Sequence, residues 1–303
     1  MVAWLTIPDL ATVLTEAPTD AIRNTFLLGV VYGIGGTAFG LAIRHVGYSL
    51  TYAIAIGISC ILRTLTGPIV KGTLSVILDK PGSHWVIWGI AVGFVGTLLC
   101  GFAGRSKEVD LIRNSGDKSS FSLEKGLPLC LIAGVFSALY GIAVNDTGKP
   151  IAALAEAHGA GHWQTNVVYI FCNTGAFVTT ALYTLFLGVH QKTMKEFIRL
   201  PDACAGSLAR NYFLAILTGC LWYFQFLFYG LGHVRMGSFK FSSWAIHMIM
   251  LILFSNLARL AMWKWVGCRR KTRITVVDAI GLLVAAVLII THRNHLGEQP
   301  AAG

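Results

Sequence analysis

The chain has 303 residues, of which 55% are hydrophobic and only 13% charged, against about 25% charged in typical soluble domains. Its mean hydropathy of +0.66 and its long apolar runs exclude a soluble protein and indicate an integral membrane protein. The net charge of +10 comes mainly from loops between the apolar runs, so it reports membrane topology and no nucleic-acid partner is expected.

The first residues, Met1–Leu14, are expected to be the end of a helix. They lack the basic stretch of a signal peptide and contain Pro8 and Asp9. Eight later segments are each long and apolar enough to span about 30 Å of hydrocarbon. Short linkers join them, which predicts an all-α integral membrane protein built as a helical bundle. The expected spans are residues 25–43, 50–70, 85–103, 127–144, 167–189, 212–231, 241–263 and 274–291.

The distribution of lysine and arginine predicts the orientation, because cytoplasmic loops are the more basic ones. The loops at 105–125, 190–210 and 264–273 are therefore expected in the cytoplasm, with the C-terminus outside. The side predicted to be cytoplasmic carries Arg44, Arg105, Lys107, Arg113, Lys118, Lys125, Lys192, Lys195, Arg199, Arg210, Lys264, Arg269, Arg270, Lys271 and Arg273, and the opposite side carries Arg23, Lys71, Lys80, Lys149, Arg235, Lys240 and Arg293.

A weak internal repeat appears when the chain is shifted by about 190 residues against itself. The pattern predicts a ten-helix duplicated transporter whose first helix, and most of the second, are missing from this chain. The whole chain, 1–303, would form one transporter domain, with a first-repeat remnant at 1–103, a cytoplasmic linker at 104–126 and a second repeat at 127–303. The shift places Gly29, Tyr32, Gly40, Leu41 and Gly47 on Gly219, Trp222, Gly230, Leu231 and Gly237.

Glycines spaced four residues apart predict close helix packing, because a missing side chain lets two backbones approach. One set is Gly29, Gly33, Gly36 and Gly40; another is Gly89 and Gly93. No paired nucleophile and base, phosphate-binding loop or cysteine–histidine cluster is present. Neither an enzyme, nor a cofactor, nor a metal site is therefore expected, and the cysteines are expected to be reduced.

The stretch at 221–247 is the strongest candidate for a binding surface. It consists of two apolar runs joined by a glycine-bearing turn, and both runs carry polar side chains that lipid would penalise. Helical periodicity places Trp222, Gln225, Tyr229 and His233 on one arc with Phe226, and places Trp244 and His247 on one face with Ser255 and Arg259. His247, and less strongly His233, are candidates for proton coupling, the alternative being a histidine that only forms a core hydrogen bond.

Three further polar residues are candidate substrate contacts. Arg63 lies on one face of its span with Tyr52, Ser59 and Thr66, and would either bind substrate hydroxyls or reach towards the interface and pair structurally. Asn173 lies on a polar helix face and either contacts a ligand or bonds a neighbouring helix. Lys149 precedes Pro150, which is expected to break the preceding helix, and would lie at the outer mouth of a cavity.

Several segments together resemble the L-rhamnose–proton symporter family of the drug/metabolite transporter superfamily. The resemblance runs from about Ile22 to the last helix. The segments are Gly40-Leu-Ala-Ile-Arg44-His-Val-Gly47, Ala53-Ile-Ala-Ile-Gly57-Ile, Gly67-Pro68-Ile-Val-Lys-Gly72, Leu221-Trp-Tyr-Phe-Gln225-Phe-Leu-Phe-Tyr229-Gly-Leu-Gly-His233-Val-Arg235, Ser243-Trp244-Ala-Ile-His247-Met and Lys149-Pro150.

The resemblance implies a ten-helix inverted-repeat fold, of which this chain would hold eight full helices and a partial N-terminal one. It implies a multi-pass protein of the cell inner membrane that imports L-rhamnose, and in some members L-lyxose, by proton symport. Arg63 departs from the small or apolar residue expected there, which would alter the choice of substrate. The alternatives are a carrier of another sugar or metabolite with the same fold, and a transport-inactive truncated relic or sensor.

Overall fold

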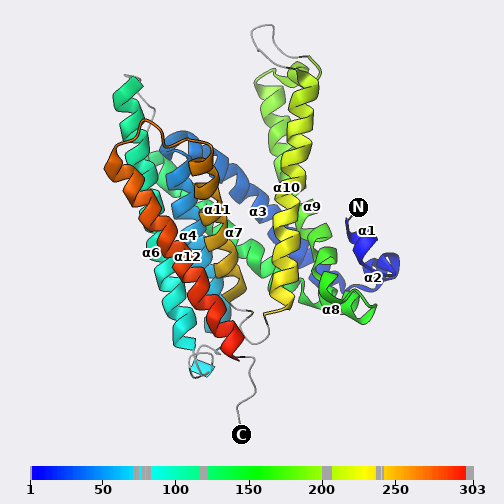
Figure 1. The fold of residues 1–303 in the computed structure, drawn as a ribbon. Helices are drawn as coiled ribbons and strands as arrows, with labels where there is room; N and C mark the ends of the chain where they lie inside the picture. Colours follow the sequence, from blue (N-terminus) through cyan, green and yellow to red (C-terminus); the bar gives the residue numbers. More distant parts are fainter. Residues whose placement is uncertain are drawn as a thin grey trace. The chain divides into compact units, whose positions relative to one another are not determined.

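A computed structural model describes residues 2–70, 72, 75–76, 79, 83–115, 122–199, 207–236, 240 and 242–297. All regular elements in these ranges are helices, and eight of them are long and apolar enough to cross a membrane (Figure 1). The predicted all-α membrane architecture is therefore confirmed. The turn expected at 237–239, together with Phe241, Lys71, Lys80 and Lys118, lies outside the described residues.

The helices form two compact units. Unit 1 comprises residues 1–34 and 143–235, and unit 2 comprises residues 35–142 and 236–303. Both units are built from segments far apart in the sequence, and their boundaries differ from those of the predicted repeats. The division into repeats stays a prediction.

Unit 1 begins with two short helices, α1 (Val2–Thr6) and α2 (Leu10–Glu16), where the sequence predicted a single helix end. The break falls at Pro8 and Asp9, where Asp9 adopts a left-handed conformation with φ of 48°. Proline disfavours a helical residue before it, and aspartate tolerates the left-handed region. Their apolar side chains share one buried core with those of α8 (Lys149–Ala157) and the start of α9 (Thr165–His190).

The first part of α3 (Thr19–Val46) packs closely against α9, through glycine on both helices. A Cβ atom on Gly29 would lie 2.1 Å from the carbonyl oxygen of Cys172, and one on Gly175 would lie 2.2 Å from that of Phe26. Gly33 is similarly close to α9, so the predicted packing is confirmed at Gly29 and Gly33. The prediction fails at Gly36 and Gly40, where no described atom lies within 4 Å of a Cβ position.

The helical segment before Pro150 ends at Thr147, as the sequence predicted, but a new helix begins at once. Helix α7 (Leu123–Ile142) continues into a π-helical turn, η1 (Ala143–Thr147), and Pro150 lies in the first turn of α8. A proline is tolerated there because the first N–H groups of a helix have no intrahelical acceptor to lose. The remaining elements of unit 1 are the 3₁₀ turns η2 (Gly161–Trp163) and η3 (Met194–Phe197) and the long helix α10 (Leu208–Val234).

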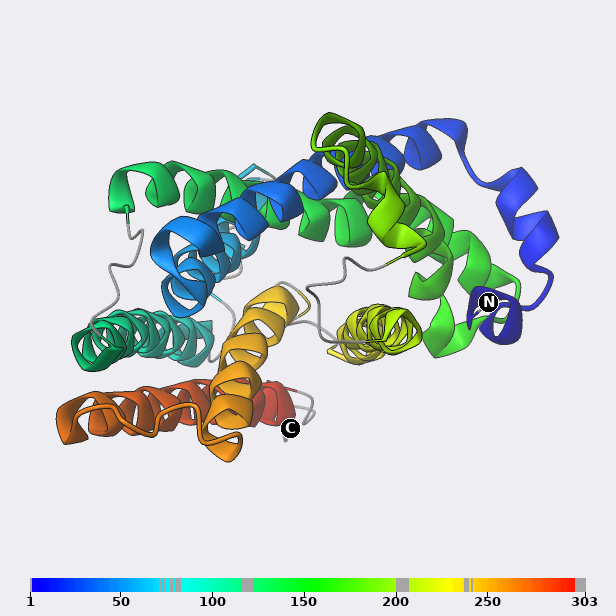
Figure 2. The same ribbon diagram turned by 90° about the horizontal axis from the view of Figure 1, so that it is seen from above.

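Unit 2 contains the rest of α3 together with α4 (Tyr48–Val70), α6 (Ser83–Ser115), α7, α11 (Ser243–Ala261) and α12 (Arg270–Gly297). Helices α6 and α12 run side by side, as Figures 1 and 2 both show. They are antiparallel, because Gly89 lies opposite Ile290 and Gly96 lies opposite Leu283. Close packing at Gly89 and Gly93, as the sequence predicted, is confirmed.

Two helix pairs of unit 2 are those that the predicted repeat would relate. A shift of about 190 residues brings α4 onto α11 and α6 approximately onto α12, and the members of each pair pack against each other. The repeat itself stays a prediction.

The start of α12 is attached to α6 by a buried carboxylate, that of Asp110. Its Oδ2 accepts hydrogen bonds from the backbone N–H of Arg269 at 3.0 Å and from the hydroxyl of Thr272 at 2.7 Å, and its Oδ1 accepts one from Nε of Arg269. A negative charge at a helix N-terminus also interacts favourably with the helix dipole. Asp110 therefore fixes where α12 begins.

We expect Asp110→Asn to lower the free energy of unfolding by about 2 kcal/mol, because charge-assisted hydrogen bonds to a buried acceptor are lost. Thermal unfolding of the detergent-solubilised protein measures the change. Asp20→Asn is the matched control, since Asp20 is exposed and its pair with Arg23 is a surface contact of 3.0 Å. Equal shifts in the two variants would contradict the structural role of Asp110.

Candidate functional site

The predicted site residues are divided between the two units. Unit 1 holds six of them and unit 2 holds three, so each group is described within its own unit. In unit 1 they are Trp222, Gln225, Tyr229 and His233 on α10, Asn173 on α9 and Lys149 on α8; in unit 2 they are Arg63 on α4 and Trp244 and His247 on α11.

A row of hydrogen bonds crosses three helices of unit 2. The indole N–H of Trp244 donates to Oγ of Ser59 at 3.1 Å, and that hydroxyl donates to Oγ of Ser137 on α7 at 3.0 Å. Trp244 is only 2% exposed and Ser59 is fully buried. A buried indole normally has its N–H satisfied, and here the partners are hydroxyls, which can also exchange hydrogen bonds with a ligand.

Arg63 lies one helical turn beyond Ser59 on α4 and is buried, at 9% exposure. Its aliphatic part packs across Gly141 of α7, where a Cβ atom would lie 2.9 Å from Cδ and Cγ of Arg63. Both roles predicted for Arg63, contact with a substrate and structural pairing or reach towards the interface, stay predictions. Arginine remains charged at all physiological pH values, and a buried charge inside a membrane bundle is typical of a functional site.

Trp244 lies near two other polar aromatic side chains. Its ring centroid is 5.6 Å from that of His247 and 6.5 Å from that of Tyr140, which is fully buried. Unit 2 thus combines flat apolar ring faces with hydroxyl, imidazole and guanidinium groups. We call Ser59, Arg63, Ser137, Tyr140, Trp244 and His247 the unit 2 cluster.

One polar group of unit 1 is built around the π-helical turn η1. The backbone N–H of Gly148 bonds to the carbonyl of Ala143 at 2.9 Å, five residues back. The side chain of Asn145 donates through Nδ2 to the hydroxyl of Tyr229 at 2.5 Å. Gly148 is required, because a Cβ atom there would lie 2.3 Å from Cγ1 of Val168. Single π-helical turns within α-helices frequently mark functional sites.

Asn145 was not among the residues predicted from the sequence. Its position within Asn145-Asp146-Thr147, three polar residues directly after an apolar run, was the available signal. Its Oδ1 is buried and has no hydrogen-bond partner among the described residues. A buried acceptor of this kind calls for an explanation, which a ligand hydroxyl or an ordered water would provide.

The other predicted site residues of unit 1 differ in their contacts and in their exposure. Trp222 packs edge-to-face on Phe226 with centroids 4.9 Å apart, and the ring of His233 lies 5.8 Å from that of Tyr229. Gln225 and Asn173 are half-buried, whereas Lys149 is exposed at the start of α8. The structure therefore brings Tyr229, His233 and Asn145 into one group and leaves Lys149 outside it.

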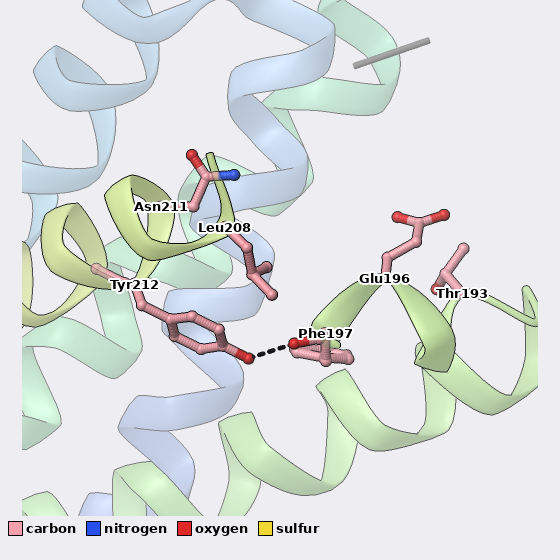
Figure 3. Close-up of a pocket in the computed structure, with 7 residues that line it drawn as sticks. Thr193, Glu196, Phe197, Leu208, Asn211 and Tyr212 are labelled. Atoms are coloured by element: carbon pink, nitrogen blue, oxygen red, sulfur yellow. Dashed lines mark hydrogen bonds between the residues drawn. The ribbon is translucent and has the colours of Figure 1, made fainter. Parts of the chain in front are cut away.

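Two pockets formed by described residues lie away from these clusters. Figure 3 shows one of about 340 Å³ between η3 and the start of α10, lined by Glu196, Asn211 and Tyr212 among others, where the hydroxyl of Tyr212 donates to the carbonyl of Phe197 at 2.6 Å. None of the predicted site residues lines it. A cavity of about 10 Å³ between α4, α6 and α11 has room for about one water.

Comparisons with known proteins agree on one family. The sequence model of the family described as L-rhamnose-proton symport protein (RhaT) matches residues 1–298. No solved structure matches the chain.

Curated relatives named L-rhamnose-proton symporter are similar over nearly the whole chain. The one from Pectobacterium atrosepticum is 30% identical over 296 residues, covering 95% of this chain and 83% of the relative. Those from Yersinia pestis and Yersinia pseudotuberculosis are each 30% identical over 306 residues, covering 99% of this chain and 85% of the relative. With its eight candidate spans, the chain is thus a multi-pass inner-membrane protein and not an enzyme, and it belongs to the L-rhamnose-proton symporter family of proton-coupled sugar transporters.

Proposed function

We propose that this protein imports L-rhamnose across the inner membrane together with protons. Membership of the family supports the proposal, as do the names of the relatives. The single structural observation that carries it is the unit 2 cluster, in which Trp244, Ser59 and Ser137 form a buried hydrogen-bonded row beside Arg63.

The chemistry of this cluster suits a deoxysugar. Such a sugar has an apolar ring face and a methyl group, which aromatic rings contact favourably, and several hydroxyls that need hydrogen-bond partners. In the proposal, Trp244 and Tyr140 contact the apolar face. Ser59, Ser137 and Arg63 bond the hydroxyls, and His247 carries the coupled proton.

Uptake into proteoliposomes tests the proposal. Labelled L-rhamnose should accumulate when the outside is more acidic than the inside, and the accumulation should disappear when a protonophore is added. Unlabelled L-rhamnose should compete strongly with the labelled sugar for uptake. Competition by L-lyxose would indicate that a related sugar is accepted. Uptake that ignores the proton gradient, or no uptake by folded protein, would overturn it.

A single substitution tests whether the unit 2 cluster binds the transported sugar. Trp244→Phe keeps an aromatic ring but removes the N–H that bonds to Ser59. We expect KM to rise about tenfold, the effect of losing one well-placed hydrogen bond at a binding site. Trp88→Phe is the control, because Trp88 is exposed on α6. Equal KM values in the two variants would place the sugar elsewhere.

One observation favours a second candidate substrate. Arg63 brings a buried positive charge into the cluster, and guanidinium groups bind carboxylates through paired hydrogen bonds. A carboxylate-bearing sugar acid would therefore fit the same site. Stronger competition by a six-carbon sugar acid than by L-rhamnose in the uptake assay, lost in Arg63→Leu, would favour this substrate over the neutral sugar.

A further inference from the structure

The exposed face of the first turns of α12 forms a shallow pocket of about 380 Å³. Its lining residues follow the spacing of one helix face, so they form a stripe along the helix axis. Two arginines lie at the loop end of the stripe and two apolar residues follow towards the membrane interior. The lining residues are Arg270, Arg273, Ile274, Val277 and Asp278.

The two arginines are available to a ligand. Arg269, which precedes them, is held by Asp110 through its backbone and its guanidinium group. In the part of the chain that the structure describes, no carboxylate forms an ion pair with Arg270 or Arg273, and both side chains are exposed. The Asp110 contacts also fix the start of α12, which places Arg270 and Arg273 at defined positions along the helix.

The apolar part of the stripe continues beyond the pocket. Val277, Gly281, Val284 and Leu288 recur at spacings of three or four residues, and all four are exposed. A Cβ atom on Gly281 would meet no described atom within 4 Å, so the glycine leaves a notch in the helix surface. This face therefore presents a row of apolar side chains that is interrupted at Gly281. The row follows Arg270 and Arg273 along the helix.

The segment before α12 has the composition of a membrane interface. Met262, Trp263 and Val266 are exposed beside the basic Lys264, with Trp263 at 79% exposure. Trp263 adopts a positive φ of 56° in a turn held by the hydrogen bond from its N–H to the carbonyl of Leu260. Tryptophan is enriched at the level of lipid headgroups, so this turn marks the membrane boundary near the arginines.

We propose that this stripe is a binding site for a phospholipid with an anionic headgroup. The lipid phosphate lies between Arg270 and Arg273, and one acyl chain follows Val277, Gly281, Val284 and Leu288. Arginine binds phosphate through charge-assisted hydrogen bonds, and basic residues at the cytoplasmic end of membrane helices attract anionic lipids. The predicted orientation places the site in the cytoplasmic leaflet. Asp278, the one acidic residue that lines the pocket, repels the phosphate and so weakens binding.

Two kinds of substitution should change the affinity for the lipid in opposite directions. Arg270→Gln with Arg273→Gln should weaken binding of phosphatidylglycerol about thirtyfold, from the contribution of two basic residues at an anionic surface. Asp278→Asn should strengthen it, because a repulsive charge is removed. Lys192→Gln with Lys195→Gln is the control, since it removes two exposed charges from another loop on the side predicted to be cytoplasmic.

Native mass spectrometry of the full chain in dodecyl maltoside, titrated with phosphatidylglycerol or phosphatidylcholine, measures the binding. We expect one saturable phosphatidylglycerol molecule per chain, which phosphatidylcholine does not displace. Arg270→Lys with Arg273→Lys, which keeps the charge, should retain most of the binding and shows that a loss in the glutamine variant is not misfolding. Equal loss in the control, or equal affinity for the two lipids, would overturn the proposal. Because no sugar is present, the result is independent of the proposed transport function.

Discussion

Replacing His247 with glutamine should abolish proton-driven accumulation of sugar and leave exchange of sugar across the membrane intact. His247 lies next to Trp244 in the unit 2 cluster, with ring centroids 5.6 Å apart. Glutamine can accept and donate hydrogen bonds like imidazole, but it cannot carry a proton near neutral pH. We expect the exchange rate to stay within about threefold, less than about 1 kcal/mol in binding free energy, while uphill accumulation falls to background.

Two assays on the same proteoliposomes separate coupling from binding. Accumulation driven by an inward proton gradient reports the coupling, and exchange of internal for external labelled sugar reports the binding. His233→Gln is the first control, and we expect it to keep accumulation. Asp146→Asn is the second, because Asp146 lies in the π-helical turn of unit 1 and is half-buried. If His247→Gln accumulates sugar and Asp146→Asn does not, the proton is carried in unit 1.

The second large effect is expected at the contact between α3 and α9. Gly29→Ala should lower the free energy of unfolding by about 3 kcal/mol, at the upper end of the usual cost of overpacking. The added methyl would lie 2.1 Å from a backbone oxygen of α9, which cannot rotate away as a side chain could. The two helices must separate, and the hydrogen bond from Oγ1 of Thr179 to the carbonyl of Val30, now 3.0 Å, would be lost.

Gly36→Ala provides the matched control, on the same helix and two turns away. Its added methyl meets no described atom within 4 Å, and replacing glycine within a helix by alanine should stabilise the helix slightly. Thermal unfolding in detergent, together with size-exclusion profiles, compares the two variants. Similar melting temperatures for both would show that the close approach of α3 and α9 does not contribute to stability.

The positions of the long helices could be predicted from the sequence, because hydropathy is a property of neighbouring residues. A run such as residues 167–189 is apolar enough to span the membrane whatever surrounds it, and α9 indeed covers Thr165–His190. The residues at which the helices begin and end were less predictable. The helix before Pro150 ends at Thr147 as predicted, but a new helix, α8, was not expected to begin at Lys149. The proline ring that disrupts a helix interior is tolerated in the first turn of α8.

Some residues of the unit 2 cluster could be selected from the sequence. Trp244 and His247 could be selected because polar aromatic residues within an apolar helix are costly in lipid. Their partners could not be identified in this way. Ser59 and Ser137 are hydroxyls that many membrane helices use for local hydrogen bonds, and only their contacts distinguish them. Asn145 was overlooked because a polar residue at the end of a span normally marks the beginning of a loop.

The sequence by itself determined that this protein is an all-α membrane protein, because the length and apolarity of each span are properties of contiguous residues. Its family was equally evident in motifs that are contiguous, such as the one ending at His247. Only the tertiary structure decided which polar side chains meet. Trp244 and Ser59 are 185 residues apart, and Asn145 and Tyr229 are 84 apart. Such pairs depend on how whole helices pack together, and neither periodicity nor hydropathy encodes that arrangement.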